Sequence, residues 1–177
     1  MHIFQNPNIT VAGTHHVAAI TKLLNAAYRG ETSKQGWTTE ANLIEGDKRS
    51  DEKSVEGIMQ QAGSVFLIYK NLEQEITGCV NLQKHVDKIY LGMFSVLPRL
   101  QGAGIGKQLL KAAEAYTLKL NCTAVYMSVI TARLELIDWY KRHGYADTGE
   151  RKAFIEDNLT GKHLQPLEFM VLQKSLD

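Results

Sequence analysis

The sequence is poor in cysteine, in proline and in net charge, and these shortages exclude several classes of protein. Its 177 residues include two cysteines, Cys79 and Cys122, and neither has the spacing of a metal ligand. A disulfide framework is therefore excluded, and we expect buried free thiols in a reducing compartment. The formal net charge of +1 gives no electrostatic support to a nucleic acid or an anionic membrane as the partner.

Long hydrophobic runs are also missing. No stretch reaches the roughly 20 apolar residues that a membrane-spanning helix requires. Residues 1–7 lack the basic start and the apolar centre of a signal peptide. We therefore expect a cytoplasmic protein that binds neither a membrane nor a metal. Its length predicts one domain, over residues 1–177.

The hydrophobic patterning predicts strands and helices in the order β-α-α-β-β-β-α-β-α-β-β. The strands are expected at 9–11, 65–69, 76–83, 89–96, 124–130, 145–155 and 166–172. The helices are expected at 14–30, 50–63, 108–120 and 133–143. A helix joins strand 89–96 to strand 124–130, so these two strands should be parallel.

The most informative segment is the glycine-rich loop that connects strand 89–96 to the next helix. The start of a helix carries unpaired N–H groups and a positive dipole end, which attract phosphate. Glycines let the backbone approach an anion closely. We therefore predict that this loop binds a pyrophosphate-bearing cofactor. The expected cradle comprises Gln101, Gly102, Ala103, Gly104, Ile105, Gly106 and Lys107.

The spacing within this loop narrows the type of cofactor. A P-loop requires Ser or Thr after Gly-Lys, but Gln108 follows Lys107 and offers no hydroxyl for Mg²⁺. A dinucleotide fingerprint requires a third glycine where Lys107 stands. The spacing that is present is Gln-x-x-Gly-x-Gly, formed by Gln101, Gly104 and Gly106.

This spacing resembles the acetyl-CoA loop of the GNAT superfamily of N-acetyltransferases. The preceding Val96-x-Pro98 and the later Trp139-Tyr-Lys-Arg-His-Gly-Tyr145 also resemble that superfamily, in the same order along the chain. The resemblance is strongest over residues 76–150. It implies a mixed α/β (α+β) fold in which helices flank a mostly antiparallel sheet and a splayed pair of parallel strands binds CoA.

The resemblance also implies the activity and the partners. An enzyme of this kind moves the acetyl group of acetyl-CoA, its cosubstrate, to a primary amine by direct attack in a ternary complex, without a metal. The acceptor would be a small-molecule amine, a peptide N-terminus or a lysine, and a homodimer is compatible with the resemblance.

The resemblance assigns roles to the strand before the loop and to the helix after the next strand. The backbone of Phe94, Ser95 and Val96 would bind the pantetheine arm, and a bulge there would splay the strand and aim the Phe94 N–H at the thioester carbonyl. Tyr140 would protonate the leaving thiolate, unless it only fills the helix face. Arg133 stands where many members carry a cofactor-binding Asn.

The acceptor site and the general base are less well defined. Tyr28 and Trp37 are expected to line the acceptor site, and Lys48-Arg49 either attracts an anionic substrate or is simply solvated. The candidates for the base are His85, Glu40 and Glu168, although each fits a solvated surface residue better.

Two rival functions remain. A non-catalytic acyl-CoA-binding module would keep the glycine loop but would not need Tyr140. A nucleotide-binding α/β protein is disfavoured by the missing Mg²⁺ ligand and by the antiparallel strands expected over 65–96.

Overall fold

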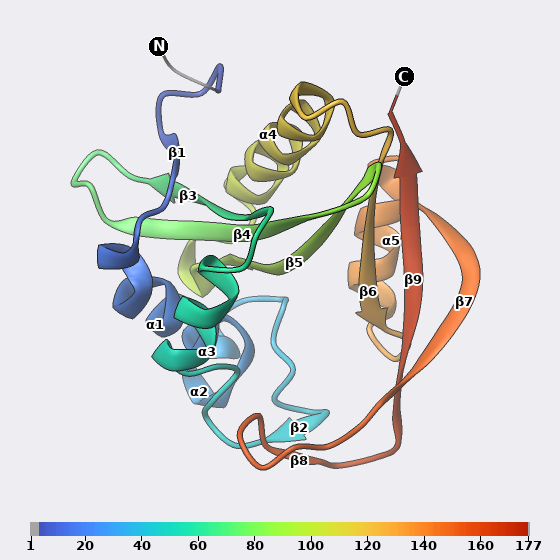
Figure 1. Ribbon diagram of the computed structural model, residues 1–177. Helices are drawn as coiled ribbons and strands as arrows, with labels where there is room; N and C mark the ends of the chain where they lie inside the picture. Colours follow the sequence, from blue (N-terminus) through green and yellow to red (C-terminus); the bar gives the residue numbers. More distant parts are fainter. Residues whose placement is uncertain (1–3, 177) are drawn as a thin grey trace.

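The computed structural model describes residues 4–176 (Figure 1). The strands are β1 Ile9–Val11, β2 Ile44–Glu45, β3 Ser64–Lys70, β4 Ile76–His85, β5 Lys88–Val96, β6 Ala124–Ile130, β7 Ala146–Phe154, β8 Lys162–His163 and β9 Leu167–Ser175. The helices are α1 Val17–Tyr28, α2 Gly30–Ser33, α3 Glu52–Met59, α4 Ile105–Lys119 and α5 Leu134–Arg142, with 3-10 turns at Thr14–His16 and Pro98–Leu100.

Seven of these strands form one mixed sheet in the order β1-β3-β4-β5-β6-β9-β7. The pair β5–β6 is parallel and the other pairs are antiparallel. The predicted fold class and the predicted parallel pair are therefore confirmed. The sequence patterning missed the short strands β2 and β8, which pair with each other apart from the main sheet.

Helices cover both faces of the sheet (Figure 1). Alternate residues of β3 show this, because successive side chains of a strand point to opposite faces. Phe66 and Ile68 pack in the cluster that contains the apolar residues of α1 and α3. Leu67 lies between them and packs in the larger cluster, with Leu109 of α4 and Ile137 of α5.

A bulge in β5 splays the parallel pair, as expected. Asn81 of β4 pairs with Gly92, whereas Cys79, two residues earlier, pairs with Ser95, three residues later, so β5 carries one extra residue here. The bulge includes Met93, whose φ of +48° is uncommon for a residue with a side chain. β5 pairs with β6 only from Lys88 to Tyr90, and the two strands separate beyond that point.

Candidate functional site

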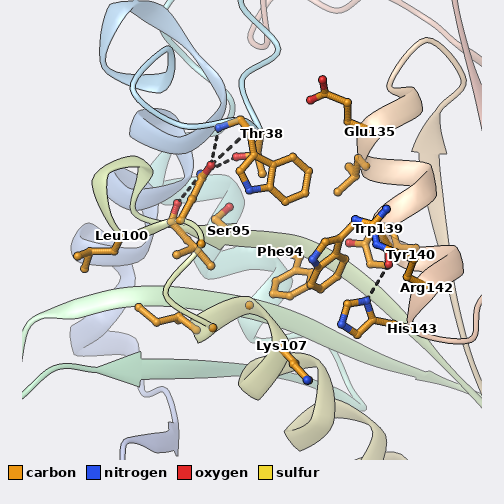
Figure 2. Close-up of a pocket in the computed structure, with 18 of the residues that line it drawn as sticks. Thr38, Phe94, Ser95, Leu100, Lys107, Glu135, Trp139, Tyr140, Arg142 and His143 are labelled. Carbon is orange, nitrogen blue, oxygen red and sulfur yellow. Dashed lines mark hydrogen bonds between the residues drawn. The ribbon is translucent and has the colours of Figure 1, made fainter.

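A cavity of about 610 Å³ lies at the separated end of β5, between the glycine-rich loop and α5 (Figure 2). Most of the residues expected to bind the cofactor or the acceptor line it together. They are Tyr28, Trp37, Phe94, Ser95, Val96, Gln101, Gly102, Gly104, Ile105, Gly106, Lys107 and Tyr140. Two expected residues, Ala103 and Arg133, do not line it. The sequence reading missed Thr38, Leu100, Glu135, Leu136, Trp139, Arg142 and His143.

The backbone of the loop provides a cluster of free donors. Gly104 is the N-cap of α4 and has a φ of +87°, which glycine adopts without strain. The N–H groups of Gln101 and Ala103 already donate to the carbonyls of Pro98 and Leu100. The N–H groups that have no acceptor within residues 4–176 are those of Gly102, Gly104, Ile105, Gly106 and Lys107. We call these N–H groups the free-donor cradle. It lacks the N–H groups of Gln101 and Ala103, which the sequence predicted as part of it.

The side chain of Gln101 has a structural role. Its Oε1 accepts from the N–H groups of Trp37 (2.8 Å) and Thr38 (3.2 Å). Its Nε2 donates to Thr38 Oγ1 (2.7 Å) and to the carbonyl of Val96 (3.0 Å). A Cβ on Gly36 would overlap with the Gln101 amide. Gln101 thus ties the loop before β2 to the end of β5, and the absence of a side chain at Gly36 makes the close approach feasible.

One face of α5 forms the opposite wall of the cavity. Leu136, Trp139, Tyr140 and His143 all line it, at the i, i+3, i+4 and i+7 spacing of a single helix face. The ring of Trp139 lies edge-on to that of Phe94, with 6.0 Å between centroids, and close to that of His143, at 4.1 Å. This spacing was the signal in the sequence that could have identified the missed residues of α5.

Tyr140 is buried, with 4% of its surface exposed. Its hydroxyl has no hydrogen-bond partner within the described residues, and burial holds its pKa well above the usual value of 10.0. The hydroxyl therefore keeps its proton at neutral pH. A neutral phenol without a partner at the wall of a cavity can donate that proton to a bound group.

A second cavity, of about 110 Å³, lies between the separated strands β5 and β6. Tyr28, Phe94 and Tyr140 line both cavities, so the two cavities adjoin at the β5 bulge. The hydroxyl of Tyr28 donates to the carbonyl of Phe94. Burial raises the pKa of Tyr28, so this donor also stays neutral.

A buried network of charged side chains borders the second cavity. Glu40 is 7% exposed, so the expectation that it is a solvated surface residue is wrong. Its Oε1 accepts from Arg133 (3.0 Å), and its Oε2 accepts from Arg29. Arg133 also donates to the carbonyl of Thr38. The structure thus places Arg133 in the second cavity rather than in the larger one, and we leave it out of the cofactor-binding set.

The other candidates for the general base lie outside both cavities. His85 is exposed at the end of β4, and the side chain of Glu168 is 54% exposed and faces Arg151. Cys79 and Cys122 are buried free thiols, and burial raises the pKa of Cys79 to about 12. Cys79 is therefore protonated at neutral pH, and neither cysteine lines either of these two cavities.

Residues 4–176 contain neither a cluster of metal-binding side chains nor a membrane-spanning helix. No group of three or more His, Cys, Asp or Glu side chains in this part of the chain is placed to hold a metal ion. No helix there has both the length and the apolar character needed to cross a bilayer.

Comparison with known families gives a match over residues 18–145, to the model of the acetyltransferase (GNAT) family. A spermine/spermidine N(1)-acetyltransferase of Bacillus subtilis is 33% identical over 64 residues, which are 36% of this chain and 42% of that relative. The match thus spans less than half of the relative's length.

Solved structures with the same fold cover nearly the whole chain. A ribosomal-protein-alanine N-acetyltransferase from Brucella melitensis has a TM-score of 0.70 at 15% identity and covers 95% of this chain and 99% of its own. An acetyltransferase of the GNAT family from Staphylococcus aureus has a TM-score of 0.68 at 16% identity, with coverages of 96% and 99%. At these identities the likeness shows the fold alone.

Proposed function

We propose that this chain, which belongs to the acetyltransferase (GNAT) family, transfers the acetyl group of acetyl-CoA to an amine by direct attack within a ternary complex. Family membership makes the chain an acyltransferase, and the direct mechanism is our proposal. The observation that carries it is the pair of cavities that adjoin at the β5 bulge. One offers the free-donor cradle and the other opens on the far side of the bulge, so there is room for the two substrates to meet there.

The residues of the larger cavity fit the proposed cosubstrate. Acetyl-CoA supplies an activated thioester, and the free-donor cradle at the start of α4 suits its pyrophosphate. Lys107 and Arg142 also line this cavity and add positive charge near the phosphates. Ser95 and Val96 lie at the end of β5, where we propose that their backbone groups bind the pantetheine arm.

We assign the polarisation of the thioester carbonyl to the N–H of Phe94. Phe94 follows Met93 in the bulge, and a bulge re-aims backbone groups away from the regular ladder. A fixed N–H donor aimed at developing negative charge is one of the larger contributions to acyl transfer. The hydrogen bond from Tyr28 to the Phe94 carbonyl fixes the next peptide, between Phe94 and Ser95, and so restrains the backbone of Phe94 on its carbonyl side.

Tyr140 is the proposed general acid. Its raised pKa keeps the phenol protonated. The thiolate that leaves has an ordinary pKa of about 8.5, and the burial that raises the pKa of Tyr140 also disfavours a charged sulfur beside it, which makes the thiolate a stronger base. Transfer of the phenolic proton to the thiolate sulfur would regenerate a neutral thiol. Tyr140 is then reprotonated from solvent water through the open cavity.

The structure favours direct transfer over an acetylated enzyme. The nucleophile of a covalent mechanism must be activated by a base or by a lowered pKa. The pKa of Cys79 is instead raised to about 12 by burial, and Cys122 is buried outside both cavities. The amine therefore attacks the thioester itself. The C–N bond forms as the C–S bond breaks, and the proton that the nitrogen loses passes to solvent water.

Two measurements test the proposed function. Calorimetry should show that acetyl-CoA and CoA bind, whereas ATP and NAD do not. A panel of amines, assayed by the appearance of free thiol, should then include at least one that is acetylated. Binding of acetyl-CoA with no turnover of any amine would favour the rival function, a non-catalytic acyl-CoA-binding module.

A further inference from the structure

We propose that the acceptor amine carries a carboxylate, which binds to Arg49 and Arg133 in the second cavity. This inference rests on the proposed function, because it names the class of acceptor that the same site would take. It predicts amino acids, or peptides that present a carboxylate, as substrates, and it excludes polyamines.

The charges around the second cavity favour an anion. Its lining includes two guanidinium groups, of Arg49 and Arg133, and one carboxylate, of Glu40. Both oxygens of Glu40 already accept from arginines, one from Arg133 and the other from Arg29, whose side chain is fully buried. Two arginines pair with this one carboxylate and Arg49 adds a third positive charge, so the surroundings of the cavity keep an excess of positive charge.

Of these three arginines, Arg49 is the one whose guanidinium has no partner among the described residues. Among residues 4–176 it has no ion pair, and its side chain makes no hydrogen bond. It lies 6.0 Å from the centroid of the Tyr28 ring, and the guanidinium of Arg133 lies 5.6 Å from the same centroid. Two guanidiniums thus gather at one aromatic ring, next to the point where the two cavities adjoin. A guanidinium without a partner is well suited to bind a carboxylate through two parallel hydrogen bonds.

The backbone at Arg49 is held firmly in place. Its N–H donates to Asn25 Oδ1 (2.6 Å), and the N–H of Ser50 donates to the same oxygen (3.0 Å). The amide of Asn25 donates in return to the carbonyl of Ser50 (3.1 Å). Asn25 belongs to α1, the helix that also carries Tyr28. The loop that presents Arg49 is therefore fixed to the helix that forms the cavity wall, so this arginine is positioned rather than free in solvent.

A further acid, Asp157, interacts with Arg49 but lies outside the second cavity. Hydrogen bonds from Thr160, and to a smaller extent the charge of Arg49, lower the pKa of the Asp157 carboxyl. Its Oδ1 accepts from the N–H groups of Leu159 and Thr160 and from the Thr160 hydroxyl. Asp157 is thus engaged in its own turn and leaves the guanidinium available.

The positive charges around the second cavity would also affect the protonation of the acceptor amine. Nearby positive charges disfavour an ammonium ion and so favour the neutral amine, which is the nucleophilic form. A polyamine would bring further ammonium groups into this field and be repelled by it. A compound with a single amine and a carboxylate satisfies both requirements, with its carboxylate at Arg49 and Arg133 and its amine directed toward Phe94 and Tyr140.

The test is a panel of matched acceptors with acetyl-CoA. Each amino acid is compared with its own carboxamide, which has the same shape but no negative charge, and spermidine is included. For the best acceptor, kcat/KM should be about 30-fold higher for the acid than for the amide, the factor of one charge-assisted hydrogen bond. Spermidine should be slower than the acid.

Two variants test whether Arg49 causes the preference for the acid over the amide. Arg49→Ala should lower kcat/KM for the acid about 30-fold, mainly through KM, and should shrink the acid-to-amide ratio accordingly. Lys48→Ala is the matched control, because it removes the same charge from the adjacent exposed residue, which does not line the cavity. It should leave both values within twofold of the parent.

The outcomes separate this inference from the proposed function. If amines are acetylated but the amides or spermidine equal the acids, the carboxylate inference is overturned and the acetyltransferase proposal stands. An unchanged acid-to-amide ratio in Arg49→Ala also overturns it. If acetyl-CoA binds and no amine reacts, the acetyltransferase proposal fails, and calorimetry with the acids and amides then decides whether the cavity still selects carboxylates.

Discussion

Replacing Tyr140 with phenylalanine removes one hydroxyl from the wall where the two cavities adjoin. The ring keeps its edge-on neighbours, since the centroids of Trp139 and Tyr145 lie 5.2 and 5.7 Å away. The hydroxyl has no hydrogen-bond partner within residues 4–176, so its loss leaves no protein group unsatisfied. The stability of Tyr140→Phe should therefore stay within about 0.5 kcal/mol of the parent.

The kinetic cost follows from the proposed role as a general acid. Positioned acids contribute typically 10²–10⁴-fold. A cavity of about 610 Å³ admits water, which can protonate the thiolate in place of the phenol, so we expect the lower end of this range. A 10²-fold fall in kcat corresponds to about 2.7 kcal/mol of transition-state stabilisation. Binding of CoA should stay within twofold, because the free-donor cradle is untouched.

Tyr145→Phe provides the matched control. Its hydroxyl bonds to Glu114 Oε1 at 3.1 Å, and it does not line either cavity. Removing it should cost about 1 kcal/mol, which lowers Tm by roughly 2–4 °C, while kcat stays within twofold. Tyr140→Phe should thus lose activity and keep its stability, whereas Tyr145→Phe should lose stability and keep its activity.

The assay measures kcat by free-thiol release and Tm by thermal unfolding, on both variants in parallel. A normal kcat in Tyr140→Phe, with a lowered Tm, would refute the assignment and make Tyr140 a core residue. The pH profile gives a second check. Because the pKa of Tyr140 is raised, its proton is retained as the pH rises toward 10, and ionisation of this residue should not reduce kcat in that range.

Three further predictions concern the loop, the thiols and the support of the loop. Gly106→Ala should weaken CoA binding at least tenfold in calorimetry with little change in Tm, because the added Cβ meets its neighbours only at ordinary contact distances and stands at the cavity wall; unchanged affinity would remove the cradle from the mechanism. The Cys79→Ala and Cys122→Ala double variant should remain active, and an acetyl-thioester found on either cysteine by mass spectrometry would contradict direct transfer. Gln101→Ala and Gly36→Ala should both raise KM for acetyl-CoA and lower Tm, and their effects should not add in the double variant, since both remove the same contact.

The parts of the site that could be predicted from sequence are those in which local chemistry dictates structure. A glycine loop at a helix start exposes backbone donors wherever it occurs, and the order of the strands around it makes one pair parallel. The cavity walls contributed by Phe94, Ser95 and the glycines therefore followed from the sequence and the family resemblance.

The parts that could not be predicted depend on contacts between distant segments. The side chain of Gln101 reaches Trp37, 64 residues earlier, and Arg133 reaches Glu40, 93 residues earlier. No local pattern marks such pairs, so Glu40 was expected in solvent and Arg133 at the cofactor. The α5 wall was missed for a different reason, because its i, i+3, i+4 spacing predicts an apolar helix face equally well whether that face is buried in a core or lines a cavity.

The bulge at Met93 links the cofactor side to the acceptor side. An extra residue in β5 ends its pairing with β6 after Tyr90, and the same separation opens both cavities. It also leaves the backbone of Phe94 between them, where the hydroxyl of Tyr28 donates to the Phe94 carbonyl. The ring of Tyr28 in turn lies close to both arginines of the second cavity. Tyr28 therefore contacts both the residue whose N–H is proposed to polarise the thioester and the groups proposed to select the acceptor, so a change at Tyr28 should affect both steps.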